Sequence, residues 1–295
     1  MLDFIIISDH PELYSSKRLV EEISQIQASA SFLDPYNYGI ELTHLKTEEK
    51  KSGIVFHRTT GIRFADFDLS VSLSLETKGK MIANSLESFN QLRGKERQAL
   101  FFAKHNIPFI PTYSFRGRPE KKRLEQITHF FKNLGFHDEA YILKTIRGNQ
   151  GIGVNIIRGN DSLASLLETF WAIQDQSFII QPFVNIEEEL RIFSISGKIE
   201  GALSRKPGKG EFRSNSARGQ AESVAPLSLP RSLHELIYKL YEKSKALYAG
   251  IDLLKKDGQY IIIEYNLVPG FDQMEHLTGT NIAKKIVHAT SQLVK

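Results

Sequence analysis

The segment GIDLLKKDGQYIIIEYNLVPGF, residues 250–271, predicts a β-hairpin, because two strand-forming runs flank the turn-forming pair Asp257-Gly258. Side chains alternate between the two faces of a strand, so Glu264 and Asn266 share a face. Glu264 directly follows three isoleucines, a run that favours burial. A buried carboxylate is costly unless it is paired or metal-bound, so the pattern indicates a functional site rather than solvated strand ends.

The position of Asp252 relative to Glu264 depends on the length of the turn. A two-residue loop would pair Asp252 with Ile263 and leave Glu264 on the other face. A three-residue loop through Gln259 would pair Asp252 with Glu264. Two carboxylates and one amide suit magnesium, which also keeps water ligands and takes phosphate oxygens. A metal site at Asp252, Glu264 and Asn266 therefore predicts the three-residue loop.

A basic, glycine-containing loop precedes the hairpin, with the sequence GKGEFRSNSARG at residues 208–219. Arg213 and Arg218 can clamp phosphate or carboxylate oxygens, and Asn215 can donate to a developing oxyanion. The glycines also suit a lid that closes over a substrate. From this segment alone, a mobile basic loop without a catalytic role is an equally good interpretation.

A second glycine-containing loop lies in the sequence KTIRGNQGIG at residues 144–153. Glycines allow backbone N–H groups to approach a phosphate, and Lys144 can add a positive charge. The loop lacks the Gly-Lys-Ser/Thr ending of a P-loop and precedes a predicted strand rather than a helix. Neither that motif nor a dinucleotide-binding fingerprint fits. By itself the segment favours an ordinary hairpin turn with an exposed lysine.

The composition is that of an ordinary globular protein. The 295 residues, 41% of them hydrophobic and 24% charged, suffice for two or three domains. The absence of cysteine excludes disulfides and thiolate metal sites and fits a reducing compartment. The apolar run at residues 4–7 is too short for a signal peptide or a membrane span, so we expect a cytoplasmic protein. The net charge of +4 comes from scattered basic residues, which suits anionic ligands without indicating nucleic acid.

Apolar periodicity predicts alternating helices and strands throughout the chain. In the first region we expect strands at residues 4–8, 31–33, 53–57 and 69–73 and helices at 15–26 and 81–92. Further helices are predicted at 95–105, 119–134, 162–173, 232–247 and 281–293. Further strands are predicted at 141–144, 154–157, 178–181, 190–195 and 199–204, before the hairpin.

Taken together, these segments resemble the ATP-grasp superfamily and, within it, the RimK-like ligases that attach glutamate to the C-terminus of a ribosomal protein. The matching segments are LYSSKRL at 13–19, Lys144 with GNQGIGV at 148–154, GEFRSN at 210–215 with RG at 218–219, GIDLL at 250–254, EYN at 264–266 with PG at 269–270, and TGTNIA at 278–283. The resemblance implies an α/β (α+β) chain in which an ATP-grasp fold follows a small α/β domain. The implied ranges are 1–93 for the N-terminal domain, 94–184 for a small lid domain, and 185–295 for a C-terminal domain with the metal and catalytic site.

The resemblance also implies a role for each matching residue. The implied nucleotide contacts are Lys95, Lys144, Gly148, Gln150, Gly151, Arg213, the adenine linker Gln181, Pro182, Phe183 and Val184, and Glu189 at the ribose. The implied catalytic residues are Arg213, Asn215 and Arg218. Asp252, Glu264 and Asn266 would hold magnesium or manganese.

The chain departs from the family pattern at several positions. Glu189 stands where the family usually has aspartate, and Pro182 replaces a usual glutamate. Near the acceptor side, Ala217 replaces a histidine, Gln220 replaces a glycine, and Leu267-Val268 replaces a small polar pair. These last departures bear on the substrate more than on the nucleotide.

The resemblance predicts an ATP-dependent carboxylate–amine ligase that forms an amide or peptide bond through an acyl phosphate. It could add an amino acid such as glutamate to the C-terminus of a protein or peptide. Three alternatives stay open: a degenerate nucleotide-binding regulator, a ligase that makes a small-molecule peptide, and a phosphotransferase. The expected partners are ATP, a carboxylate acceptor and an amino-acid donor. Membranes and nucleic acid are not expected as partners, and self-association stays open.

Overall fold

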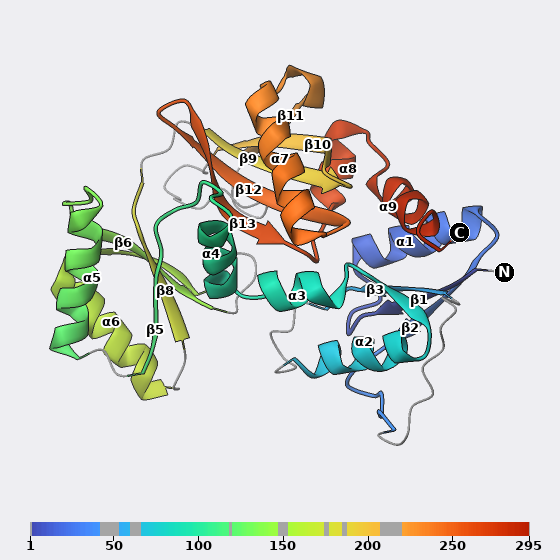
Figure 1. Ribbon diagram of the computed structural model, residues 1–295, viewed down its shortest axis with the longest axis horizontal. Helices are drawn as coiled ribbons and strands as arrows, with labels where there is room; N and C mark the ends of the chain where they lie inside the picture. The colour runs from blue at the N-terminus through green and yellow to red at the C-terminus, as the bar shows by residue number, and fades with distance from the viewer. Residues whose placement is uncertain are drawn as a thin grey trace.

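The computed structural model describes residues 2–41, 53–59, 66–117, 120–146, 153–173, 177–184, 188–206 and 220–294. Within these ranges the chain forms three β-sheets with helices packed against them (Figure 1). This mixture confirms the predicted α/β (α+β) class. Across the same ranges, every helix is too short or too polar to span a bilayer.

The first sheet is parallel, with the strand order β2-β1-β3-β4. Its strands are β1 (Asp3–Ile7), β2 (Ser29–Leu33), β3 (Gly53–His57) and β4 (Lys80–Ala83). The accompanying helices are α1 (Tyr14–Gln25), α2 (Phe67–Thr77) and α3 (Leu86–Leu92). Every residue of β3 is buried, as expected for a strand that is covered on both faces.

Helix α2 corrects the predicted strand at residues 69–73. The alternation of leucine and serine in this segment imitates a strand. In the helix, Val71 and Leu75 lie one turn apart and pack against Val55 of β3. Leu73, which the strand pattern would have placed beside them, is exposed. The tertiary contacts of one helical face therefore override the period-two pattern.

Strand β4 corrects the first part of the helix predicted at residues 81–92. Residues 80–83 pair with β3 instead, and only residues 86–92 are helical. The Ser85 hydroxyl accepts a hydrogen bond of 3.2 Å from the Ser88 N–H, which caps the start of α3. The apolar run before this cap completes the edge of the sheet.

The second sheet is antiparallel, with the order β5-β8-β6-β7, and has a core of its own (Figure 1). Its strands are β5 (Tyr113–Arg116), β6 (Ala140–Thr145), β7 (Val154–Arg158) and β8 (Ser177–Pro182). Helices α5 (Lys121–Asn133) and α6 (Asn160–Ile173) supply Ile127, Phe131, Leu163 and Leu167 to that core. Strand β5 was not predicted from the sequence.

The third sheet is antiparallel, with the order β11-β10-β9-β12-β13. Its strands are β9 (Glu188–Ile195), β10 (Lys198–Lys206), β11 (Gln220–Val224), β12 (Tyr248–Lys256) and β13 (Gln259–Asn266). Helices α4 (Lys95–Lys104) and α7 (Arg231–Ser244) pack on one face, and the short helix η1 (Pro226–Ser228) follows β11. Helices α8 (Asp272–Thr278) and α9 (Ile282–Ser291) pack on the other face. Strand β11 and helix α8 were not predicted.

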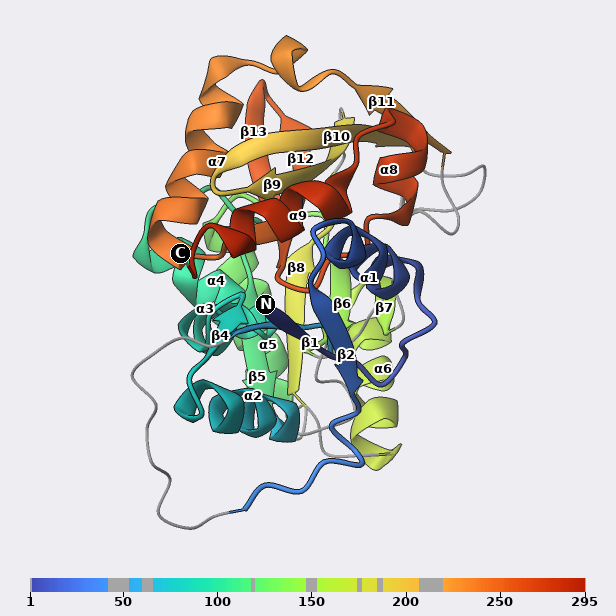
Figure 2. The same cartoon turned by 90° about the vertical axis from the view of Figure 1, so that its right-hand side faces the viewer.

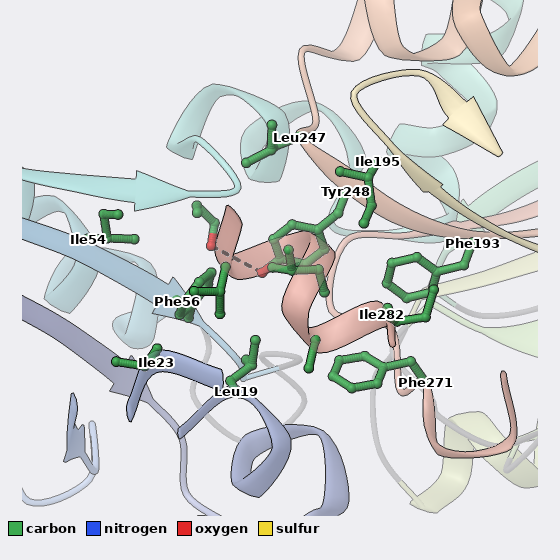
Figure 3. Packing of buried hydrophobic residues seen from close by; sticks show 14 of the residues in the cluster. Leu19, Ile23, Ile54, Phe56, Phe193, Ile195, Leu247, Tyr248, Phe271 and Ile282 are labelled. Carbon is green, nitrogen blue, oxygen red and sulfur yellow. Dashed lines mark hydrogen bonds between the residues drawn. The ribbon is translucent and has the colours of Figure 1, made fainter. Parts of the chain in front are cut away.

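The first and third sheets share one core. Phe4 and Phe56 of the first sheet pack in the same cluster as Phe193 and Tyr248 of the third, as Figure 3 shows for the labelled residues of the cluster. Helix α1 lies beside α9 in both overall views (Figure 2). These two regions are therefore packed together, whereas the second sheet builds its core separately.

A polar network reinforces the contact between α1 and the C-terminal helices. The carboxylate of Glu275 accepts hydrogen bonds from Tyr14 Oη at 2.8 Å and from Arg18 Nε at 3.1 Å. Its second oxygen accepts from the Ala283 N–H at 2.9 Å. The residues of the LYSSKRL segment thus connect the two ends of the chain.

The three sheets fall within the ranges predicted for three domains, 1–93, 94–184 and 185–295. The division into domains stays a prediction. Helix α4 packs with the third sheet, since Phe101 and Phe102 lie in the same core as Ile251. The Gln98 side chain also donates to the carbonyl of Tyr265 at 3.0 Å.

Candidate active site

One end of the third sheet carries a polar face. Arg191 lies opposite Asp252, and Asp252 lies opposite Glu264, so β9, β12 and β13 place the three side chains on one face. The adjacent Leu190 and Leu253 point to the other face and pack in the core that contains α4 and α7. Alternation along these strands therefore lines one face with charged groups.

The hairpin reaches this arrangement differently from the sequence prediction. Lys256 pairs with Gln259, so the loop has two residues, and the predicted three-residue loop is wrong. Asp257 and Gly258 have φ values of 51° and 73°, as a tight two-residue turn requires. A register shift between Asp252 and Leu253 leaves one extra residue in β13, and this bulge places Asp252 opposite Glu264.

Two arginines bind the Asp252 carboxylate. Arg191 Nη1 is 2.7 Å from Oδ2, and Arg205 Nη1 is 3.4 Å from Oδ1. Arg205 Nη1 is also 4.0 Å from Oε1 of Glu189. Neither arginine was predicted as a site residue. A sequence signal exists for Arg191, which lies two residues after Glu189 in the same strand and so shares its face.

Gly250 provides the space that Arg191 occupies. A Cβ atom at residue 250 would lie 2.5 Å from Arg191 Nη2 and 2.8 Å from the Cβ of Pro269. Both approaches are too close for a side chain to be accommodated without movement. The glycine of the GIDLL segment therefore permits the guanidinium to lie over the strand beside Asp252.

Burial and the carboxylates act in opposite directions on the two guanidinium groups. Burial lowers the pKa of Arg191, but Asp252 and Glu264 outweigh this effect, and the net pKa is raised. Burial also lowers the pKa of Arg205. There the carboxylates do not compensate fully, partly because Arg191 is near, and the net pKa stays lowered. Arg191 is thus the better compensated of the two cations.

Lys144 belongs to the second sheet, near the end of β6, and interacts with the same carboxylates of the third sheet. Burial lowers the pKa of Lys144 to about 8, and the positive charge of Lys95 contributes to the lowering. The carboxylates that oppose this effect are Glu264, Glu189 and Asp252. Two lysines and three carboxylates from separate sheets and a helix therefore form one electrostatic group.

Lys95 is the first residue of α4 and contacts Ile146, the last described residue before the glycine-containing loop. Its Nζ donates to the carbonyl of Ile146 at 3.4 Å, directly before that loop. The loop joins β6 to β7, with Lys144 opposite Val154, which confirms the predicted hairpin. Gly148, Gln150 and Gly151 lie outside the described residues.

The basic loop at residues 207–219 connects β10 to β11. Lys206 pairs with Gln220, so the two ends of the loop lie next to each other at the edge of the sheet. Arg213, Asn215 and Arg218 lie outside the described residues. Their catalytic roles stay predictions.

The segment predicted to contact adenine, residues 181–184, begins with the last two residues of the inner strand β8 and continues past its end. The Gln181 side chain donates to Thr112 Oγ1 at 2.9 Å, and Phe183 N–H donates to the carbonyl of Ala140 at 2.8 Å. Pro182 lies opposite Tyr141 in the strand register. Val184 completes the segment. These contacts fix the backbone after β8, and the proposed role at adenine stays a prediction.

The predicted metal ligands supply a suitable set of oxygen donors. Asp252 and Glu264 are cross-strand neighbours, and Asn266 shares their face two residues further along β13. Asn266 Oδ1 accepts a hydrogen bond of 2.8 Å from the Val268 N–H, which orients the carboxamide. No group of three or more His, Asp or Glu residues suited to a metal occurs in the described ranges, and the predicted set includes only two carboxylates. Hard oxygen donors of this kind fit magnesium.

The fold and the site define an ATP-grasp ligase, an enzyme that joins a carboxylate to an amine in a carbon–nitrogen bond. The model of the RimK-like ATP-grasp domain matches residues 93–290, and the chain belongs to that family. A curated relative, the probable alpha-L-glutamate ligase of Marinomonas sp. (strain MWYL1), is 25% identical over 293 residues, which cover 96% of this chain and 93% of the relative.

Solved structures share the fold over the whole chain. The ATP-grasp ligase PsnB, complexed with minimal precursor, Mg and ADP, has a TM-score of 0.72 and 15% identity, covering 99% of this chain and 97% of that one. D-alanine–D-alanine ligase from Bacillus anthracis, complexed with ATP, has a TM-score of 0.70 and 17% identity, covering 100% and 97%. These matches confirm the predicted ATP-grasp fold.

Proposed function

We propose that this ligase uses ATP to activate a carboxylate as an acyl phosphate and then joins it to the amino group of an amino acid. The observation that carries the proposal is the pairing of Asp252 with Glu264, within the electrostatic reach of Lys144. Carboxylates of the third sheet and a half-buried lysine of the second sheet suit the opposite sides of a polyphosphate and its metal.

The nucleotide would lie between the second and third sheets. Lys95 and Lys144, with the loop that carries Gly148, Gln150 and Gly151, would hold its phosphates. The segment 181–184 would contact adenine, and Glu189 would face the ribose. The position of Lys144 near Glu264 supports this assignment.

Asp252, Glu264 and Asn266 would hold magnesium. When bound, the ion would offset negative charge on the transferring phosphoryl group. The residue set supports this choice because all three donors are oxygen atoms on one face of the hairpin.

The reaction would proceed in two steps. A carboxylate oxygen of the acceptor would attack the γ-phosphorus of ATP, and the bond to ADP would break. The nitrogen of the amine would then attack the carbonyl carbon, lose a proton, and expel inorganic phosphate. Arg213, Asn215 and Arg218 would hold the phosphate and stabilise the oxyanion that forms in the second step.

We further propose that the amine donor is an amino acid such as glutamate and that the acceptor is the C-terminus of a protein or peptide. The name of the Marinomonas relative, a probable alpha-L-glutamate ligase, supports the donor class. The departures at Ala217, Gln220 and Leu267-Val268 lie near the acceptor side, so the acceptor is where this chain is expected to differ most.

The test is ADP release by the purified protein across a panel of amino acids and peptide acceptors, with mass spectrometry of the acceptor. A ligase gives ADP only when both substrates are present, and the acceptor gains the mass of one or more amino-acid residues. ADP release without amine consumption would instead indicate a phosphotransferase. Nucleotide binding without ADP release for any pair would indicate a regulator.

A further inference from the structure

Both carboxylate oxygens of Asp252 are already engaged by guanidinium groups. Arg191 holds Oδ2 and Arg205 approaches Oδ1, and the exposed fraction of the Asp252 side chain is 14%. A metal ion that takes Asp252 as a ligand must therefore compete with at least one arginine.

The contacts distinguish the two arginines. Arg191 Nη1 lies at 2.7 Å from Asp252, a distance typical of a charge-assisted hydrogen bond, whereas Arg205 Nη1 lies at 3.4 Å. Gly250 leaves room for the guanidinium of Arg191 beside the strand. Arg205 has a buried Nε that lacks a hydrogen-bond partner in the part of the chain that the structure describes. Arg205 is therefore the more weakly held cation.

Arg205 also lies beside the group that is expected to receive phosphate. Its Nη1 is within 4.0 Å of Glu189 and within 3.4 Å of Asp252, and both of these carboxylates interact with Lys144. A phosphate that Lys144 holds would thus lie near a guanidinium with an unused N–H group. Guanidinium groups bind phosphate oxygens through two parallel hydrogen bonds, which a lysine cannot match.

We propose that Arg205 is a displaceable internal cation, which neutralises Asp252 in the ligand-free enzyme and transfers to the phosphate oxygens of ATP when the metal binds Asp252. This inference rests on the proposed function, because it uses the same metal and nucleotide sites. It adds a residue that changes partner during the binding of metal and nucleotide. Arg191 keeps its contact with Asp252 and holds the carboxylate in place.

The first test measures metal affinity without turnover. Binding of Mn²⁺ is followed by electron paramagnetic resonance for the wild type and for Arg205→Met, with and without the non-hydrolysable analogue AMPPNP. Without nucleotide, Arg205→Met should bind Mn²⁺ about three- to tenfold more tightly, because the competing cation is gone. With AMPPNP the gain should shrink or reverse, because Arg205 of the wild type has then moved to the phosphates.

The matched control is Lys255→Met. Lys255 lies on β12 as Asp252 does, but it pairs with Glu188 and Tyr260 in the strand register and lies over the Tyr260 ring. Its loss removes one positive charge from the same sheet, so it reports the general electrostatic effect. Arg205→Lys keeps the charge without the forked donor, and its Mn²⁺ affinity should fall between those of the wild type and Arg205→Met.

Activity provides the second test. Arg205→Met should lower kcat for ADP release about 100-fold, since a donor to the transferring phosphate is lost. Unchanged or weaker Mn²⁺ binding by Arg205→Met without nucleotide, or a gain equal to that of Lys255→Met, would overturn the inference. Should Arg205→Met fail to fold, the Mn²⁺ affinity of Arg205→Lys without nucleotide is compared with that of the wild type instead. Affinity no higher than that of the wild type would then overturn the inference. Absence of ADP release by the wild type with every substrate pair would instead count against the proposed function, because the Mn²⁺ titration does not depend on turnover.

Discussion

Asp252 lies directly opposite Glu264 because Ile263 is bulged out of the register between β12 and β13. Without the bulge, the two-residue turn would pair Asp252 with Ile263 and place Glu264 on the apolar face. The extra residue in β13 moves the Glu264 side chain to the face that carries Asp252, so the two carboxylates lie next to each other. An irregularity in the strand, rather than the length of the turn, therefore builds the candidate metal site.

Substitution of Glu264 by glutamine should remove activity without removing the fold. The change keeps the size of the side chain and removes the charge of a proposed metal ligand. We expect ADP release to fall at least about 100-fold, since metal-ion stabilisation of the transition state amounts to several kcal/mol. The melting temperature, measured by differential scanning calorimetry, should stay close to that of the wild type.

The matched control for this variant is Glu222→Gln. Glu222 is an exposed residue of β11 in the same sheet, opposite Ser204, and has no assigned role in the site. Its substitution should leave ADP release within about twofold of the wild type, as surface changes have small effects. Near-wild-type turnover by Glu264→Gln would remove Glu264 from the metal site.

The sequence predicted the parts of the fold whose periodicity agrees with their packing. Helix α1 and strand β3 follow their apolar patterns closely. The strand predicted at 69–73 was wrong because the leucine–serine alternation of this segment belongs to a helix, in which Val71 and Leu75 reach the core. The apolar residues 81–83 form an edge strand, since their pairing with β3 is a long-range contact that local periodicity does not reveal.

The site was predictable in its residue types but not in its pairings. The ordered motifs led to Lys144, Asp252 and Glu264, and these side chains form one electrostatic group. Arg191 was missed because it lies between Leu190 and Ile192, and Arg205 because it follows Ser204 at the end of β10. Each acquires its carboxylate partner only through the sheet register. The bulge at Ile263 was missed for a related reason: no side chain in IIIEYN marks where the backbone gains a residue.

The lowered pKa of Lys144 predicts that ATP affinity depends on pH. With a pKa of about 8 in the free protein, Lys144 is mostly charged at pH 7 and mostly neutral at pH 9. The polyphosphate favours the charged form, so binding above pH 8 should take up a proton and weaken as the pH rises. Isothermal titration calorimetry in buffers of different ionisation enthalpy measures this uptake. Lys144→Met should bind ATP weakly with little dependence on pH over the same range, and an equally steep dependence in that variant would contradict the assignment.

Substitution of Gly250 by alanine should displace the Arg191 guanidinium. The new Cβ would lie 2.5 Å from Arg191 Nη2, so either the arginine or the strand must move. We expect a loss of about 1–3 kcal/mol in the free energy of unfolding, as for other overpacked sites, together with a marked fall in kcat. The control is Gly39→Ala, because nothing lies within 4 Å of a Cβ at residue 39. Equal stability and activity of the two variants would show that Arg191 does not depend on the space at Gly250.

Replacement by methionine should change the free energy of unfolding by different amounts at two buried arginines of the first region. Arg93 contacts the fully buried Asp68 and lies 3.3 Å from Asp66, so Arg93→Met leaves a buried carboxylate with less compensation. We expect it to lower the free energy of unfolding by about 3–5 kcal/mol.

Arg58 is comparably buried but differs in its partners. Its Nη2 donates to the carbonyl of Pro269 at 3.0 Å, while Nε and Nη1 have no hydrogen-bond partner in the described ranges, and burial lowers its pKa. Within the described ranges, burial and Tyr248, rather than a carboxylate, influence the pKa of Arg58. Arg58→Met should therefore cost less than about 1 kcal/mol or stabilise the fold. Urea-induced unfolding of both variants measures the difference. An equal loss of stability in the two variants would contradict this prediction. It would mean that burial alone, and not the carboxylate partners of Arg93, decides the cost of losing a buried arginine.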